Sequence, residues 1–180
     1  MIPFYIKFLF CQQLYLLWKN EKNRGTIQRV RKMDAEEMML QYRSQNNLAP
    51  MPFEAWCFGT NADLLAELVL QGRKTATSSL YELYLHEQEP LPQTGQYNVI
   101  LNSRGEAVCV IRTTAVYVSA FNKVAPLHAA KEGEGDGSLA YWRAEHEAFF
   151  TKELKAIGKE FTKTVPVVCE EFELIYPKGG

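Results

Sequence analysis

Along this chain, segments with the apolar spacing of helices are interspersed with segments that have the composition of strands. This mixture restricts the possible folds more than any other feature of the sequence. Apolar residues recur at helical spacing in some segments, and β-branched and aromatic residues dominate others. The helical segments are 64–69 and 138–157, and the strand-like segments are 97–101, 107–118 and 165–176. Because helices and strands interleave without regular βαβ alternation, we expect an α+β fold with a small barrel-like sheet. Residues 103–105 predict a hairpin turn between the first two strands.

Helix boundaries follow from capping residues. Ser138 is a good N-cap for the long helical segment, and Gly158 is placed to end it. Gly72 falls where the helix at 64–69 needs a left-handed terminator. A further helical stretch is expected over residues 79–86, before a proline-rich turn. The helix that ends at Gly72 delivers the chain directly to Lys74.

A chain of 180 residues, 47% of them apolar, is large enough to build one hydrophobic core. We expect this domain over residues 53–177, preceded by an N-terminal helix and a proline-bearing linker over 33–52. Residues 1–32 are interpreted as an extension from an incorrectly assigned start codon, because Met33 precedes an acidic turn typical of a helix start. A membrane-surface anchor is the alternative, since the apolar part of the extension is too short to span a bilayer.

The net charge of -1 conceals an uneven distribution of charged residues. Residues 1–33 hold seven Lys and Arg against one acidic residue, which leaves 13 basic and 20 acidic residues for the rest. Proteins that bind duplex nucleic acid through its phosphates usually have a basic balance. Strong binding to duplex DNA is therefore not expected, and the acidic body favours small substrates or short single strands.

The four cysteines, at positions 11, 57, 109 and 169, form no C-x-x-C pair and have no histidine at zinc-finger spacing. Neither a structural zinc site nor a disulfide framework is indicated. Cys109 and Cys169 lie in strand-like apolar runs, where a cysteine is usually a small core residue. We therefore expect reduced thiols and a cytoplasmic protein.

Residues 72–77, Gly-Arg-Lys-Thr-Ala-Thr, can carry chemistry because a helix ends and a strand begins there. If the segment is a turn that leads into the strand, the side chains of Lys74 and Thr77 can converge. A lysine held against apolar walls loses affinity for its proton, becomes a usable base and can activate a threonine hydroxyl. The alternative is a solvated lysine near a threonine packed in a strand.

Residues 132–138, Glu-Gly-Glu-Gly-Asp-Gly-Ser, place three carboxylates at alternate positions before a helix. The spacing is similar to the start of a calcium loop, but the twelfth position, which must hold a bidentate acid, is Arg143. An EF-hand is therefore excluded. One reading is that Glu132 orients Lys74 or binds a divalent cation, with Glu134 and Asp136 as further metal candidates. The other is that the acids only complement the helix dipole.

Trp142 and His146 are four positions apart on the long helix and face the same side. Trp142 can stack on a nucleobase, although a tryptophan in an amphipathic helix usually packs into the core. His146, near tryptophan and phenylalanine, is interpreted mainly as a core or rim residue. The helix therefore offers one aromatic candidate for substrate binding.

In their order along the chain, these motifs resemble the ASCH domain family of the PUA-like superfamily, over about residues 54–177. The segments that carry the resemblance are Trp56-x-Phe58-Gly59, the helix at 64–69, residues 72–77, Val-Ile-Arg-Thr-Thr at 110–114, and residues 132–136 running on to Trp142, Arg143 and His146. The resemblance implies a small β-barrel with flanking helices and a cleft into which these motifs point. PUA-like domains commonly bind RNA or modified bases, so RNA or a modified cytidine nucleoside is the expected partner.

Two activities are associated with this family. One branch, much shorter than this chain, consists of amidohydrolases that remove the acetyl group from N4-acetylcytidine with a Lys, a Thr and a Glu. Their G-x-K-x-x-T motif and a His-Ala segment before the Glu place these roles on Lys74, Thr77 and Glu132. The other branch resembles this chain more in its Trp-x-Phe-Gly and Glu-Gly-Glu-Gly-Asp motifs, and includes a protein described as a metal-dependent ribonuclease.

The resemblance and the residues together predict a hydrolase, either an N4-acetylcytidine-type amidohydrolase or a ribonuclease that needs Mg²⁺ or Mn²⁺. In the amidohydrolase, Lys74 is the base and Thr77 the nucleophile or a water-orienting hydroxyl. Glu132 sets the protonation of the lysine and protonates the leaving amine. The residues expected to contact the substrate are Arg73, Arg112, Trp142 and Arg143.

The alternative prediction is a noncatalytic PUA-like reader of RNA or of a modified nucleoside. In such a module Trp142 would stack on a base and Arg112 would contact a phosphate. The two predictions differ in whether the bound molecule is turned over.

Overall fold

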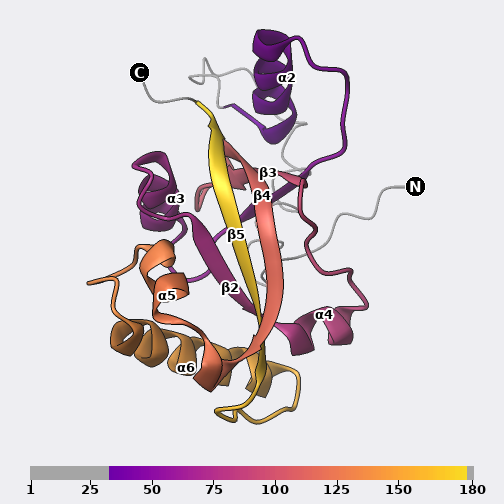
Figure 1. The fold of residues 1–180 in the computed structure, drawn as a ribbon. Coiled ribbons are helices and arrows are strands. Elements are labelled where there is room, and N and C mark those ends of the chain that lie inside the picture. The colour runs from indigo at the N-terminus through magenta and orange to yellow at the C-terminus, as the bar shows by residue number, and fades with distance from the viewer. Residues whose placement is uncertain (1–32, 178–180) are drawn as a thin grey trace. The chain divides into compact units, whose positions relative to one another are not determined.

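The computed structural model of this chain describes residues 33–177 (Figure 1). The expected extension over residues 1–32 lies outside this range. The elements are α2 (Ala35–Asn46), β1 (Glu54–Cys57), α3 (Ala62–Leu70), β2 (Ala76–Leu80), α4 (Tyr81–Glu87), β3 (Tyr97–Leu101), β4 (Ala107–Ala120), the 3₁₀ turn η1 (Phe121–Lys123), α5 (Pro126–Glu132), α6 (Leu139–Ala156) and β5 (Pro166–Tyr176). No helix of the described range is long and apolar enough to cross a membrane.

The chain divides into two compact units, where the composition led us to expect one core. Within the described residues, the first unit contains 33–70, Gln96–Arg112 and 174–177. The second unit contains Gln71–Gly95 and Thr113–Glu173. The segments of Lys74 and Glu132 therefore both belong to the second unit.

The five strands form one mixed sheet in the order β1-β3-β4-β5-β2. Strand β1 pairs with β3 in parallel, whereas β3 pairs with β4, and β2 with β5, in antiparallel fashion. The predicted hairpin between β3 and β4 is confirmed, and its turn is closed by a hydrogen bond of 3.0 Å from the Gly105 N–H to the Asn102 carbonyl. Helices and strands do not alternate regularly, so the fold is α+β as expected.

Helix α2 packs into the first unit through one buried face. Asp34 accepts a hydrogen bond of 2.9 Å from the Glu37 N–H, and the Glu37 carboxylate accepts one from the Asp34 N–H, which forms a capping box. The buried residues that join the helix to the β3–β4 hairpin are Met38, Met39, Tyr42, Val99 and Val110. The helix expected within residues 33–52 is therefore present and contributes to a hydrophobic cluster.

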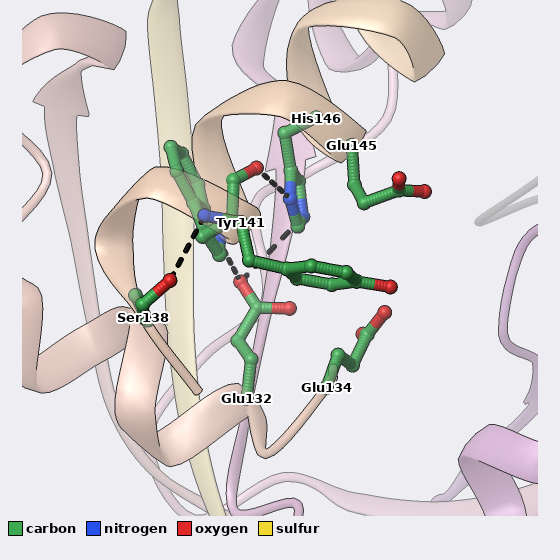
Figure 2. Close-up of a pocket in the computed structure, with 8 residues that line it drawn as sticks. Glu132, Glu134, Ser138, Tyr141, Glu145 and His146 are labelled. Atoms are coloured by element: carbon green, nitrogen blue, oxygen red, sulfur yellow. Dashed lines mark hydrogen bonds and ion pairs between the residues drawn. The ribbon is translucent and has the colours of Figure 1, made fainter. Parts of the chain in front are cut away.

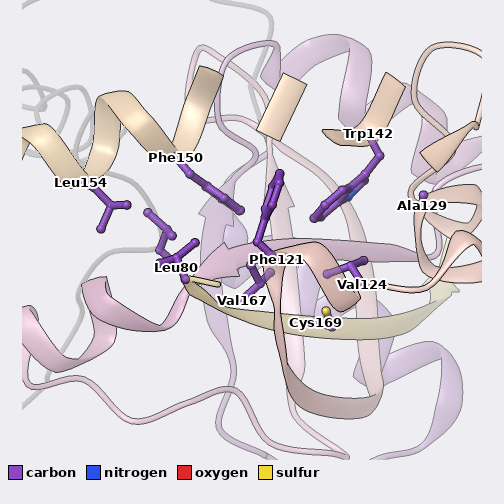
Figure 3. Packing of buried hydrophobic residues seen from close by; sticks show 10 residues of the cluster. Leu80, Phe121, Val124, Ala129, Trp142, Phe150, Leu154, Val167 and Cys169 are labelled. Carbon is purple, nitrogen blue, oxygen red and sulfur yellow. The ribbon is translucent and has the colours of Figure 1, made fainter. Parts of the chain in front are cut away.

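Helix α6 supplies much of the core of the second unit. Its N-cap is Ser138, whose Oγ accepts a hydrogen bond of 3.1 Å from the Tyr141 N–H, and Gly158 follows its end with a φ of +73°. Both predicted boundaries are thus confirmed. The inward side chains of α6 pack on Phe121 and on β5, as Figure 3 shows for Trp142, Phe150, Leu154, Val167 and Cys169.

Two local predictions differ from the structure. Ser79 and Leu80, expected to begin a helix, belong to β2, because pairing with β5 and the burial of Leu80 favour the strand. The second difference is α5, which was not predicted because a helix of seven residues is too short to show a clear period. Glu132 is consequently the last residue of a helix and not part of a loop.

The cysteines follow the expectation in part. Cys109 and Cys169 are free and fully buried, as expected of core residues. Burial raises the pKa of both thiols to about 12, so neither is a thiolate at neutral pH. Cys57 is disulfide-bonded, so the expectation of reduced thiols is wrong for that residue.

Candidate active site

The two polar segments singled out in the sequence lie against each other in the second unit. The Thr75 N–H donates a hydrogen bond of 2.7 Å to the Lys131 carbonyl, and the Arg73 guanidinium donates one of 3.4 Å to the Gly133 carbonyl. Gly133 has a φ of +69°, and a Cβ there would lie 2.3 Å from the Arg73 carbonyl oxygen. Because only glycine fits so close an approach, Gly133 brings the Lys74 segment to the end of α5.

Lys74 is buried and forms ion pairs with two carboxylates. Its side chain is 1% exposed, and its Nζ lies 3.1 Å from Glu132 Oε2 and 2.7 Å from Glu134 Oε1. An ammonium group leaves water at a cost of several kcal/mol, which only close compensation of this kind offsets. The solvated-lysine alternative is therefore wrong, and the expected contact between Lys74 and Glu132 is present.

Glu132 lies at the centre of a buried polar network. Its side chain is 2% exposed, and its Oε1 accepts hydrogen bonds of 2.6 Å from both Ser78 Oγ and Trp142 Nε1. The Nε2 atoms of His128 and His146 lie 3.4 Å and 3.6 Å from the same oxygen. The Glu132 carboxylate is therefore held in one orientation by groups from β2, α5 and α6.

These neighbours keep Glu132 ionised. Burial is the largest single influence on its pKa and acts to raise it, but the Lys74 charge, then the His146 charge and the interactions with His128, together outweigh burial. The pKa of Glu132 consequently lies well below its usual value of 4.5. A carboxyl group in this state does not protonate a leaving amine at neutral pH. The geometry favours the other part of the predicted role, in which Glu132 orients Lys74.

Strand β2 points Thr77 and Ser78 to opposite faces. Positions along β2 alternate between buried and half-buried, and Ser78 is buried whereas Thr77 is half-buried. Ser78 belongs to the Glu132 network, and its Oγ also lies 3.0 Å from His128 Nε2. No hydrogen bond within residues 33–177 joins Thr77 to Lys74 or Glu132. The catalytic role of Thr77 therefore stays a prediction.

A small pocket opens beside Glu132 (Figure 2). Its walls come from α5, the following loop and α6, and the side chains labelled in the figure are Glu132, Glu134, Ser138, Tyr141, Glu145 and His146. The Tyr141 ring lies so close to Gly135 that a Cβ there would be 2.4 Å from it. The hollow measures about 10 Å³, which is about the space of one water molecule. A ligand larger than a water molecule can enter only if side chains around the pocket move.

Trp142, the predicted stacking residue, is part of the packed core. It is 3% exposed, and its ring stacks on that of His146 with a centroid separation of 4.3 Å and an interplanar angle of 18°. Its indole N–H donates a hydrogen bond to Glu132 Oε1. This arrangement agrees with the alternative that a tryptophan on such a helix packs, and it gives Trp142 a place in the wall of the pocket.

The three arginines predicted to contact the substrate are exposed. Arg73 lies next to Lys74, and Arg143 on α6 donates a hydrogen bond of 3.2 Å to the carbonyl of Asn122 in η1. Arg112, opposite Tyr97 in the hairpin, belongs to the first unit. Contact of these residues with a substrate stays a prediction.

The acidic metal candidates, as placed, do not fit a divalent cation. The Lys74 ammonium lies between Glu132 and Glu134, where such a cation would have to bind. Asp136 Oδ1 accepts a hydrogen bond of 2.8 Å from the Ser138 N–H, and hydrogen bonds with Ser138 lower the pKa of Asp136. In the described part of the chain, no three His, Cys, Asp or Glu side chains form a group suited to a metal ion. A need for Mg²⁺ or Mn²⁺ stays a prediction.

Sequence reasoning did not assign roles to Ser78 and His128. Ser78 follows Thr77 directly, and only the register of β2 decides which hydroxyl faces Glu132. His128 lies one helical turn before Glu132, so recognition of α5 would have indicated the contact. Pro126 at the first turn of α5 was the available signal for that helix.

Comparison with known proteins agrees with this fold. The family model of the ASCH domain matches residues 54–176. The chain is similar to the crystal structure of an ASCH domain from Lactobacillus crispatus JV V101, with 33% sequence identity, a TM-score of 0.74, and coverage of 82% of this chain and 98% of that one. It is also similar to a protein from Enterococcus faecalis V583, with 35% identity, a TM-score of 0.72, and coverage of 79% and 90%. No curated protein matches the chain. The α+β, PUA-like fold is thus confirmed, and the chain belongs to the ASCH domain family.

Proposed function

We propose that this protein is an amidohydrolase of the N4-acetylcytidine type, which removes an acyl group from the exocyclic amine of a modified cytidine. The observation that carries the proposal is the burial of Lys74 between two carboxylates beside a pocket. Buried lysines with specific charge partners in a cleft are typical of functional sites, because a hydrophobic residue would fill the same space at a lower cost in desolvation.

In this reaction Lys74 acts as the base once it has lost its proton. It takes a proton from a water molecule, whose oxygen forms a bond to the acyl carbon. The bond from that carbon to the cytidine nitrogen then breaks as this nitrogen takes up a proton, which gives acetic acid and the free amine. Glu132 keeps the Nζ of Lys74 in place, and the hydrogen bonds from Ser78 and Trp142 fix the Glu132 carboxylate. Thr77 is retained as the candidate hydroxyl that orients the attacking water.

The charge of the pocket supports an amide as the substrate in preference to a phosphodiester. Three of its side chains, Glu132, Glu134 and Glu145, are carboxylates, which repel a phosphate group. A neutral amide and a nucleobase are not repelled in this way. The metal-dependent ribonuclease and the noncatalytic reader therefore serve as the competing outcomes of the test.

The test is incubation of the purified full chain with N4-acetylcytidine and, separately, with single-stranded RNA, each with and without Mg²⁺ or Mn²⁺. We expect release of acetate and cytidine without added metal. Cleavage of RNA that requires metal would favour the ribonuclease, and binding without turnover of either substrate would favour the reader.

A matched set of lysine variants identifies the base. Lys74→Arg keeps a positive charge between the carboxylates but cannot act as a base near neutral pH, so we expect a loss of about 10³-fold in kcat with the fold retained. Lys74→Ala should be inactive as well. Lys155→Ala, which changes an exposed lysine on α6, should keep full activity. Full activity of both Lys74 variants would overturn the assignment.

A further inference from the structure

The two carboxylates that bind Lys74 differ in their access to water. The Glu132 side chain is 2% exposed, and that of Glu134 is 26% exposed. Lys74 itself is 1% exposed, and its Nζ lies closer to Glu134, at 2.7 Å, than to Glu132, at 3.1 Å. Of the two carboxylates, only Glu134 connects the buried ammonium with solvent.

Glu132 is poorly suited to take a proton from Lys74. Its Oε1 already accepts hydrogen bonds from Ser78 and Trp142, and the imidazoles of His128 and His146 lie within 3.6 Å of it. A proton on this carboxyl group would weaken each of these interactions. The low pKa of Glu132 expresses the same preference for the ionised form.

The Glu134 carboxylate, unlike that of Glu132, is partly exposed to solvent. Glu134 lies between Gly133 and Gly135, and both glycines are fixed by close approaches, one to the Arg73 carbonyl and the other to the Tyr141 ring. Its backbone is thereby held in place while its carboxylate reaches Lys74. Figure 2 shows Glu134 beside the Tyr141 ring in the wall of the pocket, apart from the hydrogen bonds that surround Glu132.

We propose that Glu134 carries protons between Lys74 and the pocket, so that Lys74 can act as a base and be reset in each turnover. This inference rests on the proposed hydrolysis. Before attack, the Lys74 ammonium gives a proton to Glu134, which releases it to solvent. During attack, the neutral amine takes a proton from water. That proton then passes through the Glu134 carboxyl group to the cytidine nitrogen as its bond to the acyl carbon breaks, and the products are the free amine and acetate.

Other charged and titratable groups also face this pair, and the test has to separate them from Glu134. Glu132 and His128 approach from α5, and His146 and Glu145 approach from α6. Of these, Glu145 is exposed, lines the same pocket and has no ion pair with Lys74. It therefore provides a matched control that changes the charge of the pocket equally.

The kinetic test compares Glu134→Gln with Glu145→Gln, using N4-acetylcytidine as the substrate. We expect Glu134→Gln to lower kcat by about 10²-fold with little change in KM and to remove one limb of the pH profile of kcat, because proton transfer becomes limiting. Formate should restore part of the activity of Glu134→Ala. Glu145→Gln changes the charge of the pocket and should therefore affect KM, but it should keep both limbs of the pH profile of kcat. A fully active Glu134→Gln variant of an active enzyme would overturn the relay and leave the proposed hydrolysis standing.

A second measurement does not depend on turnover. The exchange of the Lys74 ammonium hydrogens with water can be followed by ¹⁵N NMR and assigned by comparison with Lys74→Arg. If Glu134 is the relay, exchange in Glu134→Gln should be slower by about tenfold, and exchange in Glu145→Gln should not change. Unchanged or faster exchange in Glu134→Gln would mean that Glu134 only holds Lys74 in place. This result would count against the relay even if the wild type proved unable to hydrolyse the substrate.

Discussion

Lys74 matters both for the chemistry of the candidate site and for the stability of the fold, because its charge is buried. Because Lys74 is buried between Glu132 and Glu134, its removal should affect the stability of the fold as well as the rate, since loss of the ammonium leaves a buried carboxylate without its charge partner. Activity lost in a truncation of Lys74 must therefore be separated from unfolding, which is the reason for including Lys74→Arg in the assay.

We predict that Lys74→Met lowers the free energy of unfolding by about 3–5 kcal/mol, as is usual when one partner of a buried ion pair is removed. Adding Glu132→Gln should recover part of this loss, since the uncompensated charge disappears. Urea unfolding followed by circular dichroism measures both effects. The control Lys155→Met should change stability by less than about 0.5 kcal/mol. A Lys74→Met variant as stable as the wild type would contradict the ion-pair description.

The depressed pKa of Glu132 predicts how stability depends on pH. The stabilisation from its ionised form is fully present above the usual value of 4.5 and is lost as the pH falls through the lower folded-state pKa. The free energy of unfolding should therefore fall more steeply between about pH 5 and pH 3 in the wild type than in Glu132→Gln. The exposed-site variant Glu147→Gln should follow the wild type. Equal slopes for the wild type and Glu132→Gln would contradict a buried, ionised Glu132.

At the scale of elements, the loop after α5 depends on its glycines to different degrees. Gly133 and Gly137 have φ angles of +69° and +73°, but a Cβ at Gly133 would strike the Arg73 carbonyl, whereas one at Gly137 would meet nothing within 4 Å. Gly137→Ala should lower the free energy of unfolding by about 1 kcal/mol, which is the cost of a left-handed backbone at a residue with a Cβ. Gly133→Ala should lower the free energy of unfolding by clearly more, and it should also lower activity by displacing Lys74. Thermal melts and acetate release check both, and equal effects would argue against the close approach.

The elements also show what the sequence could and could not predict. The β3–β4 hairpin and both ends of α6 could be predicted because turn and capping residues act locally. The contact of Lys74 with Glu132, 58 positions apart, was one of the readings left open by the residues, and the family resemblance favoured it. The choice of Ser78 over Thr77 depends on strand register, and the contact of His128 depends on a helix of one to two turns. Neither is visible in residue patterns alone.

At the scale of the molecule, the distribution of charge predicts weak binding of nucleic-acid polymers. Outside residues 1–33 the chain has 20 acidic and 13 basic residues. We expect single-stranded RNA to bind more weakly than about 10⁻⁴ M at 0.15 M salt, and nucleoside binding to be insensitive to salt. Fluorescence anisotropy and calorimetry measure the two. Micromolar RNA binding that weakens steeply with salt would instead favour the reader or the ribonuclease.

The contact between Trp142 and Glu132 has a practical consequence. An indole that donates its N–H to a carboxylate and stacks on an imidazole at 4.3 Å has an emission that depends on the charge of both neighbours. The candidate site therefore contains its own optical reporter. With Trp18 and Trp56 replaced by phenylalanine, the remaining emission comes from Trp142. A ligand that disturbs the Lys74 ion pairs would then change the fluorescence emission of Trp142, so that binding can be detected before a substrate is known.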